Sequence, residues 1–116
     1  MATKNLLKRI VNFMKYLVCK SVKFRSIYDR QVLLEQFARV SLISKITIKG
    51  NSIFLYLGEI ASADDGEVRA LICLFWRYGI NMQQLAIFWT PENQVWLGPR
   101  SGAYWSNLIF PRGIRI

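Results

Sequence analysis

The sequence predicts an α+β fold, and three features of its 116 residues support that prediction. Over about the first forty positions, apolar residues recur at spacings of three and four, which is typical of helices. From Lys45 to Leu57 they alternate with polar residues, which is typical of strands. A polar break at residues 62–66, SADDG, then separates two parts of the chain. We therefore expect an N-terminal lobe of two helices and a β-hairpin, residues 1–61, followed by a smaller, mostly β lobe, residues 67–116.

The first expected helix is amphipathic and runs from about residue 4 to residue 18. Its apolar stripe consists of Leu7, Ile10, Val11, Met14, Leu17 and Val18. The opposite face holds Lys4, Lys8, Asn12 and Lys15. No acidic residue precedes Asp29, so this face repels itself unless an anion lies near it. A short extended piece, residues 21–25, should follow the helix.

The second expected helix begins after Ser26 or Asp29, because either side chain can cap a helix N-terminus. Its narrow apolar stripe contains Val32, Leu33, Gln36, Phe37 and Val40. A β-hairpin then follows over residues 45–57. Its two-residue turn is Gly50-Asn51, in which the glycine supplies the positive φ that such turns need.

The later segments give weaker signals. Residues 67–77 fit a helix that is capped by Asp65 and stopped by Gly79, but this short, apolar run also suits a buried strand. We expect two strands at residues 85–90 and 94–97, joined by a turn with Pro91 at its favoured position. A last short strand is expected at residues 108–110.

The excess of positive over negative charge lies entirely in the first half of the chain. The formal net charge is +9. Residues 1–50 contain eleven Lys and Arg against two acidic residues, whereas residues 51–116 contain five of each. A one-sided field of this kind attracts polyanions at long range.

Nothing in the sequence indicates an enzyme. The chain has no histidine, which is the usual general base at neutral pH, and it shows no recognisable catalytic triad or metal site. Residues 98–102 suggest a phosphate-binding loop, but they lack the Lys-Ser/Thr that follows the second glycine of that motif. We therefore expect no small-molecule substrate and no cofactor. Asp64, Asp65 and Glu67 are either carboxylate ligands for Mg²⁺ or a solvated turn. Cys19 and Cys73 have no metal-ligand spacing, and we expect buried or inert thiols.

A membrane role is the alternative hypothesis. The longest apolar run, residues 70–76, is far shorter than the ~20 residues that a transmembrane helix needs. The basic first helix could instead lie on anionic lipid, with Phe13, Met14 and Leu17 pointing inward, or bind a partner. The first 25 residues also have the composition of a mitochondrial transit peptide, although we expect them to belong to the mature protein.

Several motifs in the first half resemble the bacterial-type small-subunit ribosomal protein eight family. Leu7 to Asn12 match its opening Leu-x-Arg-Ile-x-Asn motif. Residues 22–24 stand where that family has a short strand before its second helix. Leu33, Phe37 and residues 41–43 match its Ile-x-x-x-Leu-x-x-x-Gly-Phe-Ile signature, and a hairpin follows as in the family.

The second half is similar to the family only in places. Residues 68–71 are similar to its Ile-Arg-Gly-Leu strand, and residues 85–88 resemble the Gly-Ile-Ala-Ile strand that leads into an RNA-contacting Ser-Thr-Ser-x-Gly loop. In that loop only Thr90 keeps its identity. The family's closing Gly-Gly-Glu-Val strand is replaced by residues 106–109.

The resemblance implies a structural constituent of the ribosomal small subunit that binds folded small-subunit rRNA and neighbouring ribosomal proteins. Its divergence suggests a mitochondrial ribosome. From the basic helix face, the later loop and the resemblance together, the expected RNA-binding residues are Lys4, Lys8, Arg9, Asn12, Lys15, Lys23, Thr90, Asn93, Gln94 and Arg100. The resemblance itself implies Arg9, Asn12 and Thr90. Two alternatives stay open: Thr90 and Asn93 could simply form their turn, and the four tryptophans could be either base-stacking platforms or core residues.

Overall fold

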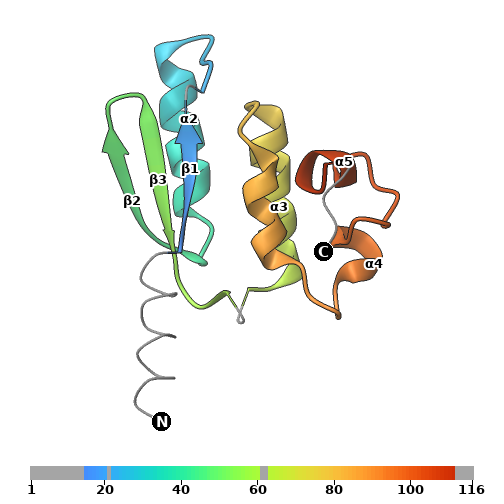
Figure 1. Cartoon of the computed structure of the whole chain (residues 1–116). Coiled ribbons are helices and arrows are strands. Elements are labelled where there is room, and N and C mark those ends of the chain that lie inside the picture. Colours follow the sequence, from blue (N-terminus) through green and yellow to red (C-terminus); the bar gives the residue numbers. More distant parts are fainter. Residues whose placement is uncertain (1–14, 21, 61–62, 112–116) are drawn as a thin grey trace.

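The computed structural model describes residues 15–20, 22–60 and 63–111, and it confirms the α+β class. Helices and a small sheet alternate along the first part of the chain, and short helices fill the rest (Figure 1). The elements are β1 (Tyr16–Lys20), α2 (Ile27–Ala38), β2 (Ile43–Lys49), β3 (Ser52–Leu57), α3 (Asp65–Arg77), the 3₁₀ helix η2 (Met82–Phe88), α4 (Gln94–Leu97) and α5 (Ser106–Ile109).

The sheet is antiparallel, with strand order β1-β3-β2. The predicted hairpin is confirmed as β2 and β3, and Gly50 in its turn has a φ of 58°. A register shift between Ile43 and Lys45 marks a β-bulge at the start of β2. Successive side chains of a strand point to opposite sides, and directly paired residues share a side. The inner face is therefore formed by Leu17, Cys19, Ile43, Ile46, Ile48, Ile53, Leu55 and Leu57.

The predicted first helix is wrong at its end, because residues 16–18 belong to β1. Leu17 and Cys19 are buried, whereas Tyr16 and Lys20 are exposed, so the burial follows the two-residue period of a strand. The spacing of Leu17 and Val18 from Met14 suggested a helix and hid this alternation. The rest of the predicted helix, residues 1–14, lies outside the described residues. The strand also precedes the extended piece that we expected at residues 21–25.

Helix α2 forms where the sequence predicted it. Ser26 is its N-cap, and Ser26 and Asp29 form a capping box. One Asp29 carboxylate oxygen accepts from the backbone N–H groups of Arg25 and Ser26, at 2.7 and 3.3 Å. Leu33 and Phe37 are buried against the sheet, but Val32, which we placed in the apolar stripe, is exposed.

The ambiguous segment after the polar break is the helix α3. Its N-cap is Asp64, one residue before the expected Asp65, and the Asp64 carboxylate accepts from the Glu67 N–H at 2.8 Å. Gly79 ends the helix with a φ of 66°, and the Ile80 N–H donates to the Phe75 carbonyl at 2.8 Å. These features define a Schellman motif. The rings of Phe37 and Phe75 meet edge to face, which packs α3 against α2.

The expectation of a mostly β second lobe is wrong. Over residues 63–111 the structure has helices and no strand. Met82, Leu85 and Phe88 are buried at intervals of three, which is the period of a 3₁₀ helix, and the Asn81 side chain caps η2. The strands expected at 85–90, 94–97 and 108–110 are therefore replaced largely by helical turns.

A single buried cluster joins both predicted lobes, with members such as Leu17, Leu33, Leu55, Leu71, Leu85 and Ile109.

Gln84 joins the second half of the chain to the edge of the sheet. Strand β1 is an edge strand, and its outward backbone groups need partners. The Gln84 side-chain amide supplies both partners for Val18: Oε1 accepts from the Val18 N–H at 2.6 Å, and Nε2 donates to the Val18 carbonyl at 2.8 Å. Nε2 also donates to the Asn81 carbonyl at 2.9 Å. The amide thereby replaces a neighbouring strand.

We expect Gln84→Leu to lower the free energy of unfolding by about 2 kcal/mol, because it leaves the partly buried Val18 N–H and carbonyl without partners. Urea unfolding followed by circular dichroism measures this change. The matched control is Gln83→Leu at the exposed neighbouring position, which should stay within ~0.5 kcal/mol of the native chain. Equal effects of the two substitutions would show that the amide contacts do not stabilise the fold.

The two cysteines should differ in reactivity. Cys19 is fully buried in β1, and burial raises the pKa of its thiol from 9.0 to about 12, because the thiolate would lose its hydration. Cys73 is exposed on α3. A maleimide should therefore modify one thiol of the native chain at pH 7 and the second only in denaturant. Mass spectrometry of the Cys73→Ser variant checks the assignment: rapid labelling of that folded variant would contradict it.

Candidate nucleic-acid interface

The outer face of the sheet combines aromatic rings with lysines. The strand register places nine side chains there in three rows: Tyr16, Tyr56 and Lys45; Val18, Phe54 and Thr47; and Lys20, Ser52 and Lys49. We call these nine residues the outer face. Its three lysines are exposed, and none of the nine residues is acidic. An anion that approaches this face meets no opposing carboxylate from the face itself.

The aromatic rings of the outer face contact one another. The Tyr16 ring lies 5.8 Å from the Phe54 ring and 5.6 Å from the Tyr56 ring, measured between centroids. The Lys45 Nζ atom lies 5.8 Å from the centre of the Tyr56 ring, which is within cation–π range. Tyr16 remains 43% exposed and so presents ring surface to solvent. Exposed rings beside lysines can stack on nucleobases while the ammonium groups meet phosphates.

One end of the sheet gathers further positive charge. Lys20 and Lys49 flank Ser52, and the strand spacing puts their Cα atoms roughly 10 Å apart. The end of β1, the hairpin turn and the N-terminus of α2 lie at this same end (Figure 1). We call this group of exposed cations the basic end, and it consists of Lys20, Lys23, Arg25, Arg30, Lys49 and Arg77. The positive N-terminus of the α2 dipole adds to its field.

The acid nearest to the basic end has a structural role. Asp29 shares a surface pocket with Lys23, Arg25 and Arg77, but its carboxylate accepts the two backbone N–H groups of the α2 capping box. As a single carboxylate beside several cations, it offsets only part of the local positive charge. Repulsion among the cations of the basic end would be relieved by a bound polyanion.

The acidic residues at the polar break and directly after it serve the N-terminus of α3. Asp64 caps the helix, and Glu67 accepts a hydrogen bond from the Ser41 hydroxyl. These contacts favour the turn hypothesis over a Mg²⁺ site. Among the residues that the structure describes, no group of three or more potential ligands could hold a metal ion. The chain reaches α3 from the far end of β3, so these carboxylates lie away from the hairpin turn (Figure 1).

The predicted site residues do not form one surface. Lys4, Lys8, Arg9 and Asn12 lie outside the described residues. Lys15 is half-buried directly before β1, and Lys23 is exposed at the basic end. Thr90, Asn93, Gln94 and Arg100 belong to the region around α4, which lies on the other side of α3 from the sheet (Figure 1).

The loop at Thr90 to Asn93 uses its side chains within itself. Asn93 Oδ1 accepts from the Thr90 N–H at 2.8 Å, and the Thr90 hydroxyl accepts from the Asn93 N–H at 3.3 Å. Asn93 Nδ2 donates to the Phe88 carbonyl at 2.7 Å. Asn93 is buried, so its amide is occupied and inaccessible. This geometry favours the alternative, that these residues form their turn, over the expectation that Asn93 hydrogen-bonds RNA.

The tryptophans are mainly structural. Trp89, Trp96 and Trp105 are partly buried and pack against the core. Their indole Nε1 atoms are buried and have no hydrogen-bond partner in the structure. The Arg69 guanidinium lies 4.2 Å from the Trp96 ring centre, so it covers a face that a base would need. Trp76 differs because it is 53% exposed and meets the Tyr104 ring at its edge.

Sequence reasoning missed the outer face, although a signal for it was present. The alternation in the predicted hairpin already assigned Lys45, Thr47 and Lys49 to the side opposite Ile46 and Ile48. Tyr16 could not be added to that side, because β1 was predicted to be helical. Arg30 and Asn51 gave no signal, since their proximity depends on how α2 packs against the hairpin.

Comparisons with known proteins give no relatives: no family model, no curated protein and no solved structure matches this chain. In the part of the chain that the structure describes, no helix has the length and apolarity to cross a membrane. Leu17, which the membrane hypothesis placed in lipid, is buried in the core at 1% exposure. That residue cannot insert into a membrane while β1 is formed.

Replacing Asn93 with Ala should destabilise the fold by about 2–3 kcal/mol, because the Thr90 N–H and the Phe88 carbonyl lose their partners. RNA affinity of the folded variant should not change. Chemical unfolding and an RNA titration measure the two quantities, with Asn107→Ala at an exposed position of α5 as control. A stable Asn93→Ala variant with weakened RNA binding would restore the loop as a binding site.

Proposed function

We propose that this chain is a non-enzymatic RNA-binding protein and a structural constituent of the ribosomal small subunit. The observation that carries the proposal is the outer face, on which exposed lysines and contacting aromatic rings lie together without an acidic residue. The basic end extends the same charge around the hairpin turn and the start of α2. Such a surface suits unpaired or distorted segments of a folded RNA better than a regular duplex.

In this proposal the protein binds RNA and catalyses no reaction. Lysines of the outer face neutralise phosphates and release their counterions, which supplies affinity that depends on salt. The Tyr16 and Phe54 rings supply stacking surface, worth about 1–3 kcal/mol for each stacked base. Arginines of the basic end can grip phosphate in a bidentate manner, whereas the lysines act as point charges.

The ribosomal part of the proposal rests on the sequence resemblance. That resemblance implies a short strand, a helix and a hairpin in this order, and the succession β1, α2, β2, β3 supports it. The strand lies at Tyr16–Lys20 and not at residues 22–24, where the motifs placed it. The helical second half departs from the strands that the resemblance implies. Neighbouring ribosomal proteins as partners and a mitochondrial location belong to the same proposal.

The salt dependence of RNA binding tests the outer face. Replacing Lys20 and Lys49 with Gln should flatten the slope of log affinity against log salt by about one to two units, because each phosphate contact contributes roughly −0.7 to −0.9. The measurement is a fluorescence anisotropy titration with a small-subunit rRNA fragment and with a scrambled duplex of equal length. The charge-matched control replaces Arg39 and Arg69 with Gln, two exposed cations outside both the outer face and the basic end. An equal flattening by the control would show a general charge effect and would refute the assignment of the outer face.

The ribosomal assignment needs its own experiment. A tagged chain expressed in its native cells should co-sediment with the small ribosomal subunit in a sucrose gradient and should crosslink to small-subunit rRNA under ultraviolet light. Sedimentation only with free protein would contradict the ribosomal assignment, while RNA binding in vitro would keep the more general proposal.

A further inference from the structure

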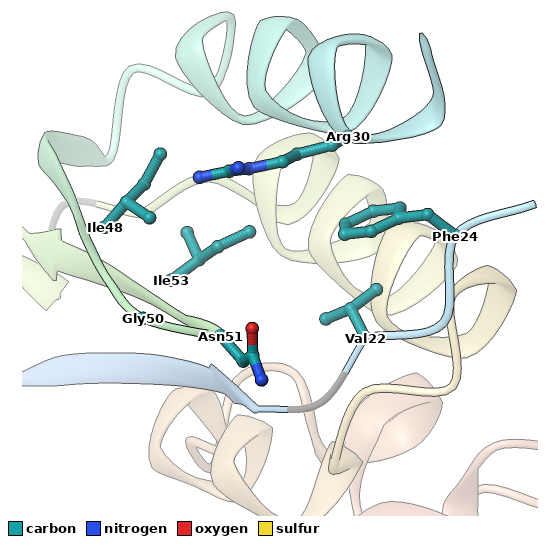
Figure 2. Close-up of a pocket in the computed structure, with 7 residues that line it drawn as sticks. All are labelled: Val22, Phe24, Arg30, Ile48, Gly50, Asn51 and Ile53. Atoms are coloured by element: carbon teal, nitrogen blue, oxygen red, sulfur yellow. The ribbon is translucent and has the colours of Figure 1, made fainter. Parts of the chain in front are cut away.

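A pocket opens at the basic end, between the hairpin turn and the start of α2. It has a volume of about 350 Å³ and is lined by Val22, Phe24, Arg30, Ile48, Gly50, Asn51 and Ile53. Figure 2 shows Arg30 reaching across it from α2, with Phe24 at one end and Asn51 on the hairpin side. The pocket is at the small end of the ~300–1,000 Å³ range of ligand sites, so it suits a single ring system and not an extended chain.

The lining has the chemistry of a base-binding site. Val22, Ile48 and Ile53 provide apolar walls, and the Phe24 ring provides a surface for stacking. Asn51 offers one hydrogen-bond donor and one acceptor side by side, which is the pattern that the edge of a nucleobase matches. Arg30 and Asn51 are both exposed, in contrast to the buried Asn93. Their polar groups are therefore accessible to a ligand.

The surroundings of the pocket favour a ligand that carries phosphate. Lys20 and Lys49 lie at the same end of the sheet, and Lys23 and Arg25 belong to the segment that lines the pocket. A base inside the pocket would place its own phosphates among these cations. The outer face adjoins this end through Lys20 and Lys49, so one RNA strand could pass from the rings of the outer face to the pocket.

We propose that this pocket holds one unpaired nucleobase of the bound RNA. The base stacks on Phe24, its edge meets the Asn51 amide, and Arg30 contacts the adjoining phosphate. This inference rests on the proposed RNA-binding function and adds base recognition to it. Stacking and edge contacts at one position are a common way for proteins to read single-stranded segments of RNA.

The probes are four ordinary single-stranded RNA 12-mers, each made of one kind of base, and an abasic ribose-phosphate 12-mer with the same charge. Phe24→Leu keeps apolar volume but removes the ring, so it should weaken binding of at least one ordinary 12-mer roughly 5- to 100-fold, as expected for one lost stack. Binding of the abasic 12-mer should not change. The matched control is Tyr28→Leu, an exposed aromatic residue of α2 that does not line the pocket.

The Phe24 ring also lies 6.3 Å from the Tyr78 ring and helps to pack that region, so Phe24→Leu can change folding as well as binding. A second variant therefore tests the pocket at an exposed residue. Asn51→Ala should weaken binding of the same 12-mer severalfold and change the preference among the four bases. Arg30→Gln should weaken ordinary and abasic RNA alike, whereas Arg39→Gln at the other end of α2 should leave both unchanged. Circular dichroism confirms the fold of each variant.

The outcomes separate the two proposals. If the native chain binds no RNA at low salt, the proposed function and the pocket both fail. If it binds RNA, but Phe24→Leu and Asn51→Ala behave like Tyr28→Leu, the base pocket is refuted and RNA binding by the outer face stands. Equal affinity of the native chain for ordinary and abasic RNA would also refute the pocket.

Discussion

The hydrogen bonds between Gln84 and Val18 connect the two halves of this protein and cover one edge of the sheet. A three-stranded sheet has two edges, and the edge at β1 is occupied by the Gln84 amide. That contact joins residues 66 positions apart in the sequence. It also holds η2 against the sheet, so α3 and the short helices form one body with the first half.

The sheet divides apolar from charged surface. Its inner face packs Leu17, Ile53 and Leu55 into the core with α2 and α3, and its outer face displays lysines and aromatic rings. Because strand residues alternate between the two faces, a shift of one residue in register would bury Lys20 and expose Cys19. The cost of burying an unpaired ammonium group makes that shift unfavourable, so core packing and the candidate interface depend on the same register.

Asn93 and Asn51 show why residue type alone is a poor guide to a binding site. Both asparagines lie in turns and offer the same amide group. Asn93 is buried, and its amide satisfies the backbone of its own loop. Asn51 is exposed at the hairpin turn and lines a pocket beside Arg30. A side chain can recognise a ligand only when the fold does not already use its hydrogen-bonding capacity.

By itself the sequence determined the α+β class, the hairpin, the capped helix α2 and the concentration of charge in the first half. These features depend on short-range rules, such as alternation around Gly50-Asn51 and the capping of α2 by Ser26 and Asp29. The strand β1, the helical second half and the composition of the outer face were decided only by the tertiary structure. Residues 16–20 and 82–88 have short apolar patterns that fit either a helix or a strand, and packing selects between them. Residues from β1, β2, β3 and α2 meet at the candidate sites through register and packing, which no local pattern specifies.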